Sequence, residues 1–219
     1  MSNTRGIECV VFDLDGVLID SSSQHAQAYS ELWTFIGING PDYFEIAGQK
    51  TLEVVEKTIR GTQISSTRVS ELVDFKQQRA RTLLMSGDIL FPDSKESLEQ
   101  IIYITKSIAI ATAASSYIAN YAANQLAPSR SFDAIVAAEN VSRSKPDPEV
   151  FNTAMKQCDS APTKTLIIED SAAGLSAAIQ SGAFVACVRT GLELPSERFL
   201  GSFEGLEGVS RYLNGYSEK

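Results

Sequence analysis

Five short runs of mostly apolar residues constrain the fold of this chain more than any other feature of its sequence. Runs of this length and composition are typical of strands buried on both faces of a parallel sheet. Helix-like stretches separate the later runs, and strands that alternate with helices predict an α/β fold with a doubly wound, Rossmann-like parallel sheet. The runs span residues 7–12, 107–112, 134–138, 165–168 and 183–188.

The segment of residues 21–88 differs from the rest, because it contains no convincing buried strand. A capping-box pattern at Ser21 predicts a helix that begins near Ser22. Two further helical patterns end at Gly61 and Gly87, and glycine commonly follows the last turn of a helix.

These patterns predict two domains. The core consists of residues 1–20 and 89–219, and a helical cap of residues 21–88 is inserted after the first strand. This insert is expected over the carboxyl edge of the sheet, where open α/β sheets bind ligands. A lid at that edge excludes water and recognises substrate.

The charge of the chain limits its partners. The sequence holds 19 basic and 27 acidic residues, with a formal net charge of −8 and a pI near 4.8. No basic stripe is visible, so nucleic acid is not an expected partner. An acidic protein binds anionic phosphate only where the charge is locally inverted, for example by a divalent metal and well-placed lysines.

Other bulk features favour a cytoplasmic protein. The apolar runs are far shorter than a membrane span, and the amino terminus lacks the apolar stretch of a signal peptide. Three cysteines occur without a C-x-x-C spacing, which favours free thiols in a reducing compartment. No pattern indicates an oligomeric partner.

The first chemical motif comes directly after the first predicted strand. Asp13 and Asp15 flank one residue, so both carboxylates leave the sheet on the same side. One acid can attack phosphorus, and the other can exchange a proton with the leaving oxygen and then with water. Gly16 permits the tight turn that follows. The alternative is a plain acidic turn, since Asp-Gly is common in loops.

Three more motifs end later strands or precede helices. Thr112, followed by Ala113, offers a hydroxyl and backbone N–H groups for a phosphoryl oxygen, although threonine at a strand end is commonplace. Lys145 precedes Pro146, with Asp147 predicted as a helix N-cap, and a fixed ammonium there neutralises phosphoryl charge. A solvated surface lysine is the alternative.

The fourth motif is Glu169-Asp170-Ser171, after another apolar strand. Carboxylates at a strand end suit a metal ligand set. The alternative is a helix amino terminus that acidic residues stabilise. Each motif has an ordinary explanation when taken alone, but their joint order across four strand ends favours one active site.

Together these motifs resemble those of the haloacid dehalogenase superfamily. The matching residues are Phe12-Asp13-Leu14-Asp15-Gly16-Val17-Leu18, Ala111-Thr112, Ser144-Lys145-Pro146-Asp147-Pro148 and Ile168-Glu169-Asp170-Ser171-Ala172-Ala173-Gly174. The resemblance implies that Asp13 is the nucleophile and Asp15 the general acid and base. It implies that Thr112 and Lys145 hold the phosphoryl group. The resemblance also implies that Mg²⁺ is bound by Asp13, the Asp15 carbonyl and Asp170, with Glu169 close by.

The helical insert resembles the capped subgroup that contains β-phosphoglucomutase and sugar-phosphate phosphatases. In that subgroup a histidine occupies the place of His25, and a basic residue near Lys50 reaches the distal end of a sugar phosphate. Lys76 is a second candidate for that contact. For both lysines, a solvated helix face is an equal alternative.

The mutases of this subgroup place polar residues two and four positions after the threonine to hold a second phosphate. Here these residues are Ala114 and Ser116, so only Ser116 keeps a polar side chain. Three hypotheses follow: a magnesium-dependent phosphatase acting on a small phosphorylated metabolite such as a sugar phosphate, a phosphosugar mutase, or a non-catalytic binding protein on the same fold.

Overall fold

A six-stranded, all-parallel sheet forms the centre of the computed structural model, which describes residues 6–126 and 128–215. The strand order across the sheet is β3-β2-β1-β4-β5-β6. In that order the strands span Ala134–Val136, Ser107–Ala111, Cys9–Phe12, Thr165–Glu169, Phe184–Val188 and Phe199–Phe203. The predicted α/β fold is therefore confirmed.

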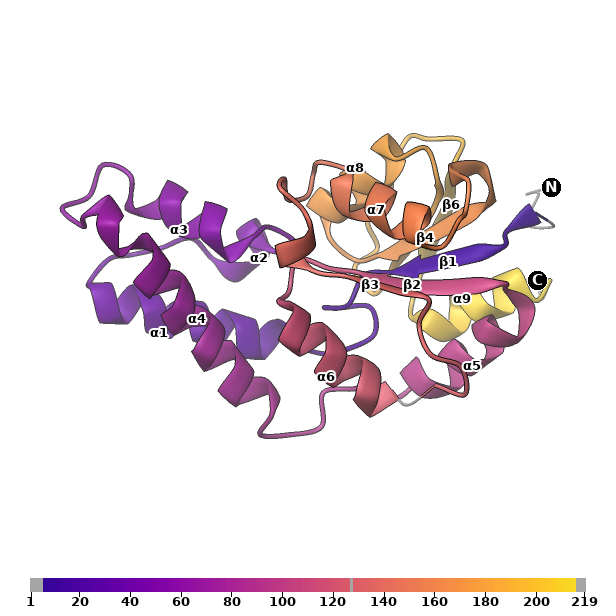
Figure 1. The fold of residues 1–219 in the computed structure, drawn as a ribbon, viewed down its shortest axis with the longest axis horizontal. Coiled ribbons are helices and arrows are strands. Elements are labelled where there is room, and N and C mark those ends of the chain that lie inside the picture. The colour runs from indigo at the N-terminus through magenta and orange to yellow at the C-terminus, as the bar shows by residue number, and fades with distance from the viewer. Residues whose placement is uncertain (1–5, 127, 216–219) are drawn as a thin grey trace.

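Helices cover both faces of the sheet (Figure 1). On one face lie α5 (Ser94–Ile104), α6 (Ser116–Leu126) and α9 (Leu206–Leu213). On the other face lie α7 (Glu149–Gln157) and α8 (Ala172–Gln180). Side chains of β1 alternate between the two resulting cores, and all four of its residues have no exposed surface. Short 3₁₀ turns span Ser66–Arg68, Ala138–Asn140 and Pro162–Lys164.

The strand β6 was not predicted from the sequence. All five of its residues are half-buried, and it pairs only with β5 at the edge of the sheet. An edge strand that includes Gly201 and Ser202 lacks the apolar run that marks the buried strands. The five predicted strands are all present, each within two residues of its expected ends.

Four helices lie beyond the carboxyl ends of the strands and form the cap (Figure 1). They are α1 (Ser22–Ile36), α2 (Tyr43–Ile46), α3 (Thr51–Ile59) and α4 (Val69–Leu84). The cap has a core of its own, in which Leu32 and Trp33 of α1 pack with Val55 of α3 and Leu72 of α4. The exact bounds of the two domains stay a prediction.

Two chain segments connect the cap to the core, and they lie side by side. The Asp20 N–H donates to the Ile89 carbonyl at 2.7 Å, and Ile19 forms an antiparallel bridge with Leu90. Within the described residues, no helix is both long enough and apolar enough to cross a membrane.

Candidate active site

The strand register brings the predicted site residues to one edge of the sheet. Phe12 pairs with Ile110 of β2 and with Ile168 of β4, so these three strands end at the same level. Asp13 follows β1 directly and Glu169 ends β4, while Thr112 follows β2. A cavity of about 530 Å³ lies at this edge, lined by both core and cap residues.

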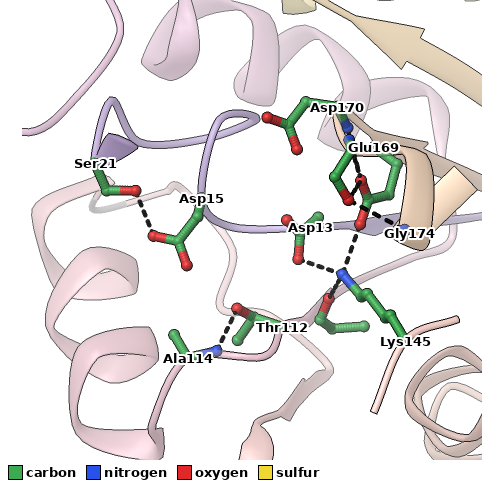
Figure 2. A network of polar contacts seen from close by, with 11 residues as sticks. Asp13, Asp15, Ser21, Thr112, Ala114, Lys145, Glu169, Asp170 and Gly174 are labelled. Carbon is green, nitrogen blue, oxygen red and sulfur yellow. Dashed lines mark hydrogen bonds and ion pairs between the residues drawn. The ribbon is translucent and has the colours of Figure 1, made fainter. Parts of the chain in front are cut away.

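Lys145 reaches the same edge from the loop before α7. Its Nζ lies 2.6 Å from Asp13 Oδ1 and 2.7 Å from Glu169 Oε1 (Figure 2). The residue is 2% exposed, which excludes the alternative of a solvated surface lysine. Burial alone favours the neutral amine, but the charges of Asp13 and Glu169 raise the pKa of Lys145 above its usual range. The side chain is therefore a fixed cation beside Asp13.

The turn that follows Lys145 differs slightly from the prediction. The residue at the N-cap of α7 is Pro148, one position after the predicted Asp147. The Asp147 side chain still caps the turn, because its Oδ1 accepts a hydrogen bond from the Glu149 N–H at 3.0 Å.

Both carboxylate oxygens of Glu169 are occupied. Oε1 accepts from Lys145, and Oε2 accepts from the N–H groups of Asp170 at 2.8 Å and Ser171 at 2.7 Å. A Cβ added at Gly174 would lie 1.7 Å from Glu169 Oε1, so the carboxylate fits only because α8 has a glycine there. Glu169 therefore holds Lys145 and the start of α8.

Asp13, Glu169 and Asp170 each offer an oxygen, and these atoms lie within 4.8 Å of one another. Burial and the charge of Glu169 raise the pKa of Asp170 to about 9. Burial, against the opposing charge of Lys145, raises the pKa of Asp13 to about 7. A Cβ at Gly16 would lie 1.9 Å from Asp170 Oδ2, which brings Asp170 against the loop of Asp15. This crowded acidic cluster fits a metal site.

Asp15 turns away from Lys145 and toward the cap (Figure 2). Its Oδ1 lies 2.5 Å from the Ser21 hydroxyl and 3.2 Å from His25 Nε2. Burial favours the neutral acid, but the contact with His25 and the hydrogen bond from Ser21 lower the pKa of Asp15 to about 2. The capping-box prediction at Ser21 was therefore wrong in its details, because this hydroxyl binds Asp15 and makes no cap hydrogen bond.

His25 connects Asp15 to the cap helix α4. Lys76 Nζ lies 2.9 Å from His25 Nδ1 and 4.4 Å from the centre of the Tyr29 ring. Burial lowers the pKa of Lys76 to about 8, and burial and the charge of Lys76 lower the pKa of His25. Because a protonated lysine only donates, His25 Nδ1 accepts and Nε2 carries the proton that points to Asp15.

Thr112 lines the cavity and is 1% exposed. Its Oγ1 accepts from the Ala114 N–H at 3.0 Å, which leaves the hydroxyl proton available for donation. Ala113 also lines the cavity.

Two predicted substrate-binding residues are not among those that line the cavity. The hydroxyl of Ser116 donates to Glu139 at 2.8 Å, at the start of α6. The Lys50 ammonium donates to the carbonyl of Val141, a core residue.

Several residues around the site were missed from the sequence. Tyr43 of α2 stacks on His25, with ring centres 6.0 Å apart and planes inclined by 10°. The Asp42 side chain accepts from the Phe44 N–H at 2.9 Å, so an N-cap pattern at Asp42 marked this short helix. The contact between Glu53 of α3 and Ser144 was also missed, because it joins residues 91 positions apart.

The sequence profile of haloacid dehalogenase-like hydrolases matches residues 10–188. The chain is 31% identical to β-phosphoglucomutase of Bacillus subtilis strain 168 over 195 residues, which cover 84% of each protein. It is 28% identical to the fructose-1-phosphate phosphatase of Escherichia coli strain K12, over 79% of this chain and 92% of that protein.

Solved structures agree on the fold. The structure of CbbY from Rhodobacter sphaeroides in complex with phosphate has a TM-score of 0.77 and 24% identity, over 93% of this chain and 96% of that one. A hydrolase from Pseudomonas syringae has a TM-score of 0.81 and 23% identity, over 96% and 100%. The chain belongs to the haloacid dehalogenase-like hydrolase family.

Proposed function

We propose that the protein is a magnesium-dependent phosphatase that hydrolyses a small phosphorylated metabolite, in particular a sugar phosphate, through a phosphorylated Asp13. One observation carries this proposal: Asp13 lies at the cavity with Lys145 at 2.6 Å, while Asp15 is held separately by the cap-side residues Ser21 and His25. A nucleophile and a proton-transfer group are thus kept apart by different partners.

In the first half of the reaction, a carboxylate oxygen of Asp13 attacks phosphorus and the bond to the ester oxygen breaks. Asp15 donates its proton to that leaving oxygen, which departs as an alcohol. The dianionic ester close to Asp15 favours the protonated acid, against the contacts that lower its pKa in the free protein. Lys145 and the Thr112 hydroxyl bind the phosphoryl oxygens.

In the second half, Asp15 is a carboxylate and takes a proton from a water molecule that attacks the phosphorus. The bond between phosphorus and Asp13 then breaks, which releases inorganic phosphate and restores both aspartates. The Nε2 proton of His25 orients Asp15 for both transfers, and Lys76 maintains the tautomer of His25.

Asp13 and Asp170, with the backbone carbonyl of Asp15, are the residues that would hold Mg²⁺. Such an ion supplies positive charge that offsets the crowded carboxylates and the phosphoryl group. The raised pKa values of Asp13 and Asp170 support this assignment, because both reflect burial among like charges.

A phosphosugar mutase is the second candidate, and the 31% identity to β-phosphoglucomutase favours it. The same residues would form the phosphorylated aspartate, but a second sugar hydroxyl would accept the phosphoryl group in place of water.

The test is incubation of the protein with Mg²⁺ and a panel of sugar phosphates, followed by measurement of free phosphate and of isomerised product. Phosphate release at every turnover supports the phosphatase. Isomerisation without release supports the mutase, and the absence of turnover on every substrate contradicts both.

A further inference from the structure

The cavity carries more negative than positive side chains. Within the described part of the chain, its lining includes four carboxylates, and its only lysine and arginine are Lys76 and Arg189. Three of the carboxylates, at Asp13, Asp15 and Asp170, belong to the phosphoryl end. The fourth, Glu45, is an exposed residue of the cap helix α2.

Both basic residues are already bound by protein groups. Lys76 contacts His25 and the Tyr29 ring, and it is only 4% exposed. Arg189 donates to Asp93 Oδ1 at 2.7 Å, and its guanidinium carbon lies 3.5 Å from the centre of the Phe91 ring. A ligand phosphate would compete with these protein groups for the charge of each cation, although the buried Nε of Arg189 has no hydrogen-bond partner among the described residues.

Lys50 and Lys145 do not supply a replacement. The Lys50 ammonium is bound to the Val141 carbonyl, and Lys50 does not line the cavity. Lys145 lies between Asp13 and Glu169, where it serves the transferred phosphoryl group. A second phosphate on a substrate would therefore meet Lys76 and Arg189 only in competition with their protein partners, and Glu45 adds a further negative charge to the lining.

The cap end is instead built from aromatic rings and uncharged polar groups. Tyr43 and Phe44 provide ring faces, while Gln49, Thr51 and Gln77 provide amide and hydroxyl groups. Aromatic faces bind the apolar C–H surface of a ligand, and amides both donate and accept hydrogen bonds. These groups match a body that carries hydroxyls and no charge.

We propose that the cap half of the cavity selects substrates with a single phosphate on an uncharged, hydroxyl-bearing body, and that it rejects bisphosphates. The selection rests on the proposed function, because the first phosphate is taken to lie at Asp13. It follows from the pairing of Lys76 and Arg189 with protein groups, together with the position of Glu45.

The test uses the full chain with Asp13→Asn, because a protein without the nucleophile does not consume the ligands during the measurement. Calorimetric titration with Mg²⁺ present compares glucose 6-phosphate with glucose 1,6-bisphosphate, and fructose 1-phosphate with fructose 1,6-bisphosphate. We expect at least one monophosphate to bind at least tenfold more tightly than its bisphosphate. A preference for the monophosphate that stays below tenfold in both pairs, or the absence of monophosphate binding, overturns the proposal.

A second variant tests the cause of the selection. Glu45→Lys in the same background is expected to raise bisphosphate affinity about five- to tenfold and to change monophosphate affinity less than twofold. The matched control is Glu56→Lys, at an exposed position of α3 that does not line the cavity, and it is expected to change neither. An equal effect of the two substitutions overturns the role of Glu45. Failure of the proposed function is seen separately, as absence of phosphate release by the unsubstituted enzyme.

Discussion

The ammonium group of Lys145 lies 2.7 Å from the Oε1 of Glu169, a side chain with no exposed surface. Without Glu169, Asp13 would be the only carboxylate that pairs with the buried ammonium of Lys145. The second carboxylate, fixed by the N–H groups of Asp170 and Ser171, keeps Lys145 charged and aimed at Asp13. We infer from this pairing that Glu169 positions the lysine, a role that its place beside Asp170 in the sequence does not distinguish from metal binding.

Asp13→Asn is expected to abolish turnover while the fold stays intact. The amide is nearly the same shape as the carboxylate, but it is a far weaker nucleophile toward phosphorus. Turnover and the far-ultraviolet circular dichroism spectrum are the two measurements. Near-normal activity in this variant would remove Asp13 from the role of nucleophile.

Lys145→Ala is expected to lower kcat/KM by several orders of magnitude, because the phosphoryl charge loses its fixed cation. The variant also leaves Asp13 and Glu169 as buried carboxylates without a cation, so its melting temperature is measured alongside activity. Lys145→Arg keeps the charge and serves as the control for folding. A fall in kcat/KM below about tenfold, roughly 1.4 kcal/mol, contradicts the role.

Lys76→Met is expected to lower activity and yet to stabilise the protein at pH 7. Burial lowers the pKa of Lys76 from 10.5 to about 8, so the folded state binds this proton less tightly than the unfolded chain. Folding is therefore penalised below about pH 8, and the penalty disappears as the pH rises toward 10.5. After the lost contact with His25 is allowed for, we expect Lys76→Met to raise the free energy of unfolding by roughly 1 to 2 kcal/mol at pH 7.

Urea unfolding of both proteins at pH 7 and pH 9.5 checks this prediction. The stability difference between variant and wild type isolates Lys76 from the other groups that titrate over this range. A difference that is the same at both pH values shows that the charge of Lys76 is not the cause.

Glu53→Gln is expected to lower kcat/KM about three- to tenfold, because it removes a charged hydrogen-bond acceptor worth roughly 1 kcal/mol. Glu53 Oε1 accepts the Ser144 N–H at 3.3 Å, and Oε2 accepts the Ser144 hydroxyl. The bond joins the cap helix α3 to the residue directly before Lys145. Glu56→Gln, at another exposed position of the same helix, is the matched control. Identical kinetics for both variants would show that this contact does not support the site.

Mg²⁺ is expected to raise the melting temperature of the wild-type protein, and chelation is expected to abolish phosphate release. A cation held by Asp13 and Asp170 would bind the folded state and would relieve the repulsion between the buried carboxylates. Asp170→Asn removes one charged ligand and is expected to shrink the thermal shift. A shift of equal size in wild type and variant would place the cation elsewhere.

The sequence by itself determined the class of fold and the polar residues that meet at one edge of the sheet. Strand-length apolar runs and the residues that follow them are local features, and parallel strands in one sheet must end at the same edge. Asp13, Thr112 and Glu169 were therefore predictable, since each lies at the end of its own strand.

Only the tertiary structure decided which protein groups each charged side chain contacts. Lys50 and Lys76 were equivalent candidates in the sequence, yet Lys50 binds the Val141 carbonyl and Lys76 is buried against His25. The edge strand β6 also appeared only in three dimensions, and the short helix α2, which carries Tyr43, was marked in the sequence only by its N-cap residue Asp42. The physical reason is that burial and charge pairing depend on which surfaces of cap and core meet, and no local pattern records that contact.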